Sequence, residues 1–153
     1  MQLLLFKDLV VLNWAFCLAY VGAFVLLPFE VGTLLAMVIA LLSGLVVDVF
    51  YDTLGIHAAA AVLSAYLRGP LLKVLTPAGG YEPYMEPTIP SMGLQWYALF
   101  LGPLLAVHAT VLFAIEYADI TMLPLAAGKG VASAAFTLVV VALLQNVLVP
   151  KTT

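Results

Sequence analysis

The chain has 153 residues, of which 65% are hydrophobic and only 8% are charged, and its mean hydropathy is +1.20. Soluble domains carry about 25% charged residues, so this composition excludes a domain with a water-facing surface all round. We therefore expect an all-α polytopic membrane protein in which residues 1–153 form a single transmembrane domain. The net charge of −3, with no basic patch, argues against nucleic acid as a partner. The single cysteine, Cys17, excludes a disulfide within the chain.

Five apolar stretches are long enough to cross a bilayer, which takes about 20 residues. In chain order they are Leu9–Pro28, Val31–Val47, Leu54–Leu75, Leu94–Ile115 and Val131–Val149. The sequence thus predicts a bundle of five complete transmembrane helices. The apolar start, Met1 to Asp8, remains as a fragment too short for a span.

One connection is long. The segment Thr76–Met92 holds four prolines, two tyrosines and two glutamates. Proline at this density excludes a helix, so we predict an irregular surface loop. Such a loop is either a contact surface or a plain connector. If it is a contact surface, the candidate residues are Tyr81, Glu82, Pro83 and Tyr84.

The few cations predict the orientation. Arg68 and Lys73 precede the long loop, and Lys151 follows the last span. The excess of positive charge on cytoplasmic loops places both the 76–92 loop and the C-terminus in the cytoplasm. Lys129 opposes this orientation, although Glu116 and Asp119 lie near it in the sequence.

Small residues recur every four positions in the second span: Gly32, Ala36, Ala40 and Gly44, followed at the same spacing by Asp48 and Asp52. Small side chains let helix backbones approach closely, which is how helices associate within lipid. The pattern predicts a packing seam along this helix.

The segment from Gly44 to Ala58 places two carboxylates and a histidine between two apolar runs. His57, Ala61, Ser64 and Arg68 then fall on one side of the third span, which we expect to face protein rather than lipid. We predict a tight helical hairpin that turns at Thr53–Gly55. Asp52 is the expected N-cap of the third helix, because aspartate at a helix N-terminus accepts backbone hydrogen bonds.

Three chemical interpretations of this cluster compete with a structural one. Asp48, Asp52 and His57 fit no strong metal-ligand spacing. A proton or ion path through Asp48 with His57 or His108 is a further alternative. No nucleophile motif and no phosphate-binding glycine loop are present. We therefore predict a non-enzymatic protein without metal or cofactor, in which Asp48, Asp52, Gly55, His57 and Arg68 serve helix packing.

These residues also carry a resemblance. Gly44-Leu-Val-Val-Asp48, followed by Leu54-Gly55-Ile-His57-Ala58-Ala59, resembles the signature of the rod shape-determining MreD family. Ala65-Tyr-Leu-Arg68, Leu75-Thr-Pro77 and Gly79-Gly-Tyr81-Glu-Pro83 resemble the corresponding helix and cytoplasmic loop in the Bacteroidetes-like branch. Pro28-Phe-Glu30 and Phe136-Thr137, with Leu144-Gln145, match as well. The resemblance extends from about Leu5 to Gln145.

The resemblance implies a multi-pass subunit of the bacterial cell-elongation machinery in the cytoplasmic (inner) membrane. Its partners would be MreC, with the glycosyltransferase RodA and its transpeptidase in the same complex, and MreB indirectly. The family fold is a six-helix bundle related to substrate-binding subunits of vitamin transporters. Here Met1 falls inside the family's first helix, which predicts a truncated first helix and a natural start upstream.

The alternative function is a substrate-binding membrane subunit of a vitamin-type transporter. That function requires polar side chains that converge on a pocket. The candidates for such a pocket are the His57–Ser64–Arg68 face, Glu116 and Gln145.

Overall fold

The computed structural model describes residues 10–11, 15–16, 18–82 and 85–148. Two strands, β1 (Val10–Val11) and β2 (Ala15–Phe16), pair antiparallel with Val10 opposite Phe16. The 3-10 helix η1 (Ala19–Val21) and the single-turn helix α2 (Gly22–Val25) follow. The remainder consists of the long helices α3 (Thr33–Tyr51), α4 (Ile56–Val74), α6 (Leu94–Tyr117) and α7 (Leu123–Leu148), with α5 (Ile89–Met92) and η2 (Ile120–Met122) in the connections.

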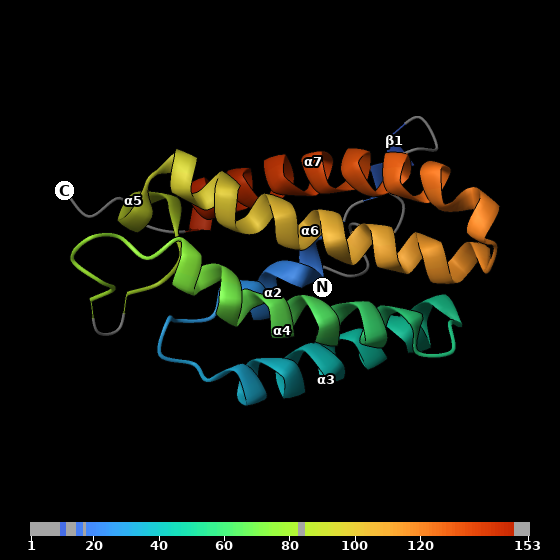
Figure 1. Ribbon diagram of the computed structural model, residues 1–153, viewed down its shortest axis with the longest axis horizontal. Coiled ribbons are helices and arrows are strands. Elements are labelled where there is room, and N and C mark those ends of the chain that lie inside the picture. Colours follow the sequence, from blue (N-terminus) through green and yellow to red (C-terminus); the bar gives the residue numbers. More distant parts are fainter. Residues whose placement is uncertain (1–9, 12–14, 17, 83–84, 149–153) are drawn as a thin grey trace.

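The four long helices run side by side as two hairpins. α3 packs on α4, α4 on α6, and α6 on α7, so α3 and α7 form the outer edges (Figure 1). The short helices η1 and α2 pack across this layer, with η1 against α7 and α2 against α3 and α4. The N-terminal segment therefore joins the two hairpins.

Among the residues that the structure describes, three helices are long and apolar enough to cross a membrane, namely Thr33–Tyr51, Leu94–Tyr117 and the Leu123–Gln145 part of α7. α4 is as long as α3 but less apolar, because it carries His57, Arg68 and Lys73. The predicted helical bundle is thus confirmed and is compatible with a membrane protein, whereas five complete spans are not confirmed.

The predicted first span, Leu9–Pro28, is wrong as one continuous helix. Within the described part of this stretch, β1 and β2 are extended, and helix is present only from Ala19 to Val25. β-branched Val10 and Val11 favour extended backbone, and Pro28 disfavours helix at the residue before it. The Met1–Asp8 fragment lies outside the described residues.

Two boundaries also differ from prediction. α7 begins at Leu123 rather than at Val131, and Pro124 is compatible with this start because proline lacks only an N–H that a first turn leaves unpaired. The loop predicted to be free of helix contains α5, a single helical turn in which Pro90 is the second residue. A capping box stabilises the start of this turn. The backbone N–H of Thr88 donates to Ser91 Oγ, and the two hydroxyl groups also form a hydrogen bond with each other. The rule against proline in helices does not hold for a first turn.

α6 forms the centre of the core because it has neighbours on both sides. Its buried side chains include Tyr97, Phe100, Leu101, Leu104 and Leu105, all within 1% of complete burial. Phe24 and Val25 of α2 join the same core. These two residues of a one-turn helix thus fill part of the core that the predicted span Leu9–Pro28 was expected to fill.

Glycines allow two close contacts between helices. A Cβ on Gly44 of α3 would lie 2.4 Å from the Cα of Ala58 on α4. A Cβ on Gly130 of α7 would lie 2.5 Å from Thr110 Oγ1 and 2.9 Å from Thr110 N on α6. Ala36, Ala40, Gly44 and Asp48 lie on the buried side of α3, whereas Gly32 and Asp52 at its ends are exposed. In each hairpin, therefore, one glycine lets the two helices approach each other closely.

Gly130→Ala should destabilise the protein, because the added methyl group would meet the Thr110 backbone. Overpacking of this kind costs about 1–3 kcal/mol. Gly128→Ala is the matched control in the same helix, since nothing lies within 4 Å of its Cβ position. It should be neutral or stabilising by up to about 1 kcal/mol. Thermal unfolding in detergent, followed by circular dichroism, measures both; equal effects of the two variants would contradict the close contact.

Candidate functional site

Polar side chains gather along the inner side of α4, inside an otherwise apolar bundle. His57, Ser64 and Arg68 of α4 are buried, together with Asp48 of α3 and His108 of α6. A polar group buried without a partner costs free energy, so the partners of each of these groups indicate what the group does.

Asp48 caps α4 from the neighbouring helix. Its Oδ1 accepts a hydrogen bond from the backbone N–H of His57 at 3.0 Å, and its Oδ2 accepts one from Ala58 N–H at 3.0 Å. Thr53 Oγ1 donates to the same carboxylate at 2.5 Å. These two N–H groups belong to the first turn of α4, where no partner exists within the helix. A negative charge there is also favoured by the helix dipole.

The predicted cap at Asp52 is therefore wrong. The residue that precedes the first turn of α4 is Gly55, which offers no side-chain bond, and Asp48 supplies the missing carboxylate across the hairpin. Asp52 instead ends α3 in a left-handed conformation with φ of 55° and is exposed. Gly55 has φ of 87°, a value that side chains disfavour, which explains a glycine in this turn.

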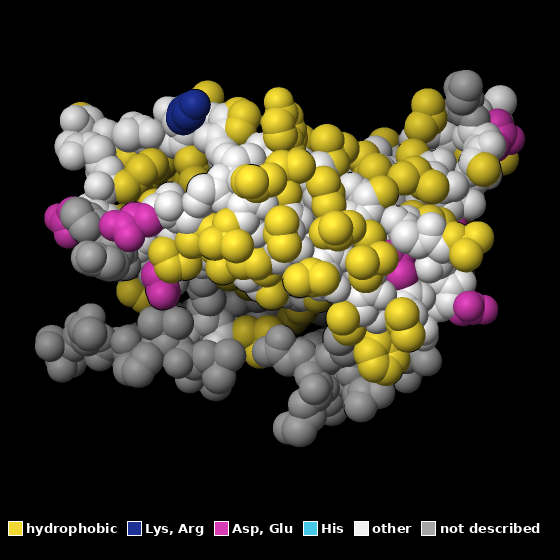
Figure 2. Space-filling view, turned by 90° about the horizontal axis from the view of Figure 1, so that it is seen from below, with side chains coloured by type: hydrophobic (Ala, Val, Ile, Leu, Met, Phe, Trp, Pro, Cys, Tyr) yellow, Lys and Arg dark blue, Asp and Glu magenta, His cyan; other side chains and the backbone are white. Residues whose placement is uncertain are grey.

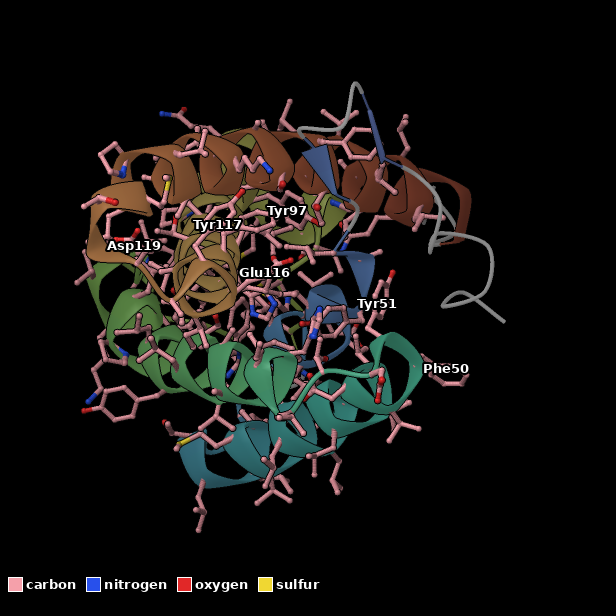
Figure 3. All side chains as sticks on the ribbon, turned by 90° about the vertical axis from the view of Figure 1, so that its right-hand side faces the viewer. Phe50, Tyr51, Tyr97, Glu116, Tyr117 and Asp119 are labelled. Atoms are coloured by element: carbon pink, nitrogen blue, oxygen red, sulfur yellow. The ribbon has the colours of Figure 1, made fainter. Side chains whose placement is uncertain are left out.

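His57 completes the Asp48 cluster. Its Nδ1 lies 3.0 Å from Asp48 Oδ1, and because a carboxylate only accepts, Nδ1 carries the proton. The imidazole ring contacts Tyr51 at 5.4 Å and Tyr20 at 6.2 Å between centroids. Figure 3 shows Tyr51 at the end of the α3–α4 hairpin. The histidine thus holds the carboxylate in place at the start of α4.

His108 ties η1 and α4 to α6. Its Nε2 lies 2.6 Å from Tyr20 Oη, and its Nδ1 lies 3.5 Å from Ser64 Oγ. Ser64 donates its own proton to Ala60 O at 2.9 Å, so its oxygen acts as the acceptor for His108. We therefore assign the proton of the neutral imidazole to Nδ1, which makes Tyr20 the donor to Nε2.

Arg68 binds the end of α2 and the chain segment that follows it. Its Nε donates to Val25 O at 3.0 Å, and Nη2 donates to Leu27 O and to Pro28 O. Nη1 donates to Val31 O at 3.4 Å. Because α2 is a single turn, these carbonyls have no helical N–H to bind, and a planar guanidinium can reach several of them at once. Arg68 thus replaces helical hydrogen bonds that the short α2 lacks.

The loop residues proposed as partner contacts divide into two groups. Tyr81 is half-buried: its hydroxyl donates to Leu72 O at 2.8 Å, and its ring stacks on Phe29 at 4.1 Å. Burial raises the pKa of Tyr81, which keeps the hydroxyl protonated as a donor. Glu82 is exposed, whereas Pro83 and Tyr84 lie outside the described residues. Tyr81 therefore anchors the loop to α4.

Sequence reasoning missed the residues that join the N-terminal segment to the bundle. Tyr20 bonds His108, and the backbone N–H of Leu18 donates to Thr137 Oγ1 on α7 at 2.9 Å. Sequence reasoning also missed the bond that Trp96 of α6 donates to Leu75 O, at 2.9 Å, just after α4. The chain pattern carries no signal for these pairs, since each joins residues far apart in the sequence.

The described residues contain no group of three or more His, Cys, Asp or Glu side chains that could hold a metal ion. Among the predicted transporter-pocket residues, Gln145 Oε1 accepts from Ile89 N–H at 3.3 Å. Glu116 lies near the end of α6, where Figure 3 labels it, and it is exposed. Gln145 is thus bonded within the fold, and Glu116 lies on the surface.

Comparisons of the chain with protein-family models, with curated proteins and with solved structures find no match. The resemblance to the MreD family therefore stays a prediction that the sequence motifs alone support.

Asp48→Asn should destabilise the protein, because an amide cannot accept all the bonds that the carboxylate accepts. Leaving one or two buried donors unpaired costs about 1–3 kcal/mol each. Hydrogen–deuterium exchange of the His57 and Ala58 amides should increase together with a lower unfolding temperature. Asp52→Asn makes the same chemical change at an exposed site and should shift stability by less than about 0.5 kcal/mol. Similar losses in both variants would refute the capping role.

Arg68→Lys should loosen the segment after α2, although it keeps the charge. An ammonium group cannot reproduce the fork that contacts several carbonyls, and the expected loss is on the order of 2–3 kcal/mol. Faster amide exchange across residues 25–31 would report it. Lys73→Gln changes an exposed cation one turn further along α4 and should leave this exchange unchanged. Unaltered exchange in Arg68→Lys would show that the carbonyl contacts do not hold the segment.

Proposed function

We propose that this protein is a non-enzymatic membrane scaffold of the bacterial cell-elongation machinery, similar to MreD. The observation that carries the proposal is the role of the motif residues in the fold. Gly44 lets α4 approach α3 closely, Asp48 caps α4, and the His57 side chain donates a hydrogen bond to Asp48. The motif that suggests the family therefore builds one rigid hairpin. A scaffold needs this kind of rigidity, whereas a catalytic site needs groups left free to react.

The bundle fits a membrane position in which all four long helices cross the bilayer. Figure 2 shows apolar side chains over the middle of the α3 side and acidic side chains toward its two ends. α4 joins the other three in this proposal because its polar groups are bonded inside the bundle and do not face lipid. The segment before α3 completes the membrane domain as the fifth, shorter element.

The orientation follows from the cations. Lys73 lies on the end of the bundle that carries the loop after α4, and the positive-inside rule assigns that end to the cytoplasm. The turns after α3 and α6 would then face the outside. Glu116, Tyr117 and Asp119, labelled in Figure 3, lie at the turn after α6. Lys129, which opposes this orientation, lies 5.4 Å from the Tyr117 ring and is held by it.

In this function the protein would hold the transmembrane helix of MreC and present its outer turns to the base of the MreC outer domain. RodA and its transpeptidase would join through the same assembly, and MreB through MreC. The transporter-subunit alternative is weaker, because His57, Ser64, Arg68 and Gln145 each bind a partner within the fold. Those side chains are therefore not free for a ligand.

The decisive experiment is co-purification with MreC. The two chains, co-expressed and extracted in mild detergent, should elute together at a fixed ratio, and a single-span protein unrelated to MreC should not. The exposed variant Asp52→Asn should retain the complex, while Asp48→Asn should lose it in proportion to its loss of folded protein. A folded chain that never co-elutes with MreC, but binds a small molecule, would replace this proposal by the transporter alternative.

A further inference from the structure

We infer that the outer face of α3 contacts the acyl chains of the bilayer along the whole helix, and that no partner helix covers it. This inference deepens the proposed membrane scaffold and rests on it, because it states which side of the bundle meets lipid. Four observations support it: the pattern of burial, the bonding of polar side chains, the length of the helix, and the size of the outward side chains.

Burial on α3 is confined to one narrow stripe. Ala36, Ala40, Gly44, Val47 and Asp48 are buried, and they lie on the side that packs against α4. The opposite side is apolar and open, with Leu34 at 77% and Val49 at 81% exposure. The exposed apolar residues between them are Leu35, Val38, Leu41, Leu42, Leu45 and Val46. A surface of this kind is unfavourable in water and favourable in hydrocarbon.

The polar side chains of α3 avoid the outer face. Ser43 Oγ donates to Ile39 O of its own helix at 2.8 Å, and Asp48 is bonded to α4. Thr33 Oγ1 points at Gly69 of α4, where it lies 2.9 Å from the position of a Cβ. In hydrocarbon each polar group needs a partner within the protein, whereas a water-facing helix has no such requirement. This arrangement therefore indicates lipid as the surrounding medium.

The length of α3 matches the hydrocarbon core. Its 19 residues span about 28 Å at 1.5 Å per residue, close to the ~30 Å of a bilayer interior. Exposed carboxylates flank it, Glu30 before the helix and Asp52 after it. In Figure 2 the acidic side chains likewise lie at the two ends of the apolar face. The apolar face begins and ends where a bilayer would.

The outward side chains disfavour a second helix on this face. Membrane helices associate closely through small residues, and the chain uses Gly44 and Gly130 for close contacts between its own helices. The outward positions of α3 carry Leu and Val instead, so a partner helix would gain little over lipid, which is equally apolar. Acyl chains are flexible and can adapt to an irregular apolar surface, so they are the groups that we expect in contact with this face.

The test is site-directed nitroxide labelling in vesicles of phosphatidylethanolamine and phosphatidylglycerol. Cys17→Ala removes the native thiol, and Val38→Cys, Leu42→Cys and Val46→Cys each introduce one label on the outer face. Oxygen, which dissolves in hydrocarbon, should relax these labels several-fold more than a water-soluble nickel complex does, with the greatest contrast at Leu42. Val47→Cys, on the buried stripe, is the control and should be poorly accessible to both reagents.

Three results would overturn the inference. Strong relaxation by the nickel complex would place the face in water. Spin–spin broadening between labels would show a second copy on it, and loss of oxygen access when MreC is added would show MreC on it. The last result would support the proposed function while removing this inference. Conversely, oxygen access together with absence of any MreC complex would keep the lipid face and remove the proposed function.

Discussion

The interaction on which the rest of the structure depends is the capping of α4 by the Asp48 carboxylate. It satisfies two backbone N–H groups at the start of a buried helix and at the same time fixes the angle and register of α3 on α4. Gly44 lies one turn away and lets the backbones meet there, so the hydrogen bonds and the close packing act on the same contact. In an apolar environment such bonds have no water to compete with them, and an unpaired N–H would be costly. The carboxylate therefore has a structural role, and its charge is stabilised by the hydrogen bonds that it accepts.

The same requirement explains the N-terminal segment. The end of α2 and the segment after it leave carbonyls without helical partners, and Arg68 supplies donors to them from inside the bundle. Tyr20 and Leu18 then bond α6 and α7, so one segment connects both hairpins through hydrogen bonds. The aromatic group of Phe29, Tyr81 and Trp96 closes the same end and attaches the proline-rich loop. Polar side chains would be unfavourable in contact with lipid. Here they instead form hydrogen bonds between the helices, which fix the orientation of the helices more closely than apolar packing alone does.

Hydropathy was a good guide to the long helices and a poor guide to the N-terminal segment. The predicted spans for α3, α4 and α6 agree with the structure to within a few residues, because each is a long apolar run bounded by glycine, proline or a charged residue. Leu9–Pro28 passes the same test of length and apolarity, yet its described residues pair as strands and short turns. An apolar composition indicates that a segment avoids water. It does not indicate whether the segment forms one long helix or several short elements.

For the site, the sequence by itself determined which residues are too polar for their surroundings and that those on α4 share one face, since helical periodicity alone places His57, Ser64 and Arg68 together. It also determined the membrane class, because so few charges cannot cover a soluble surface. Only the tertiary structure decided the partners: that Asp48, not Asp52, caps α4, that Arg68 binds backbone carbonyls, and that His108 meets Tyr20. The physical reason is that local propensities act over a few residues, whereas these bonds join groups that become neighbours only when the helices pack.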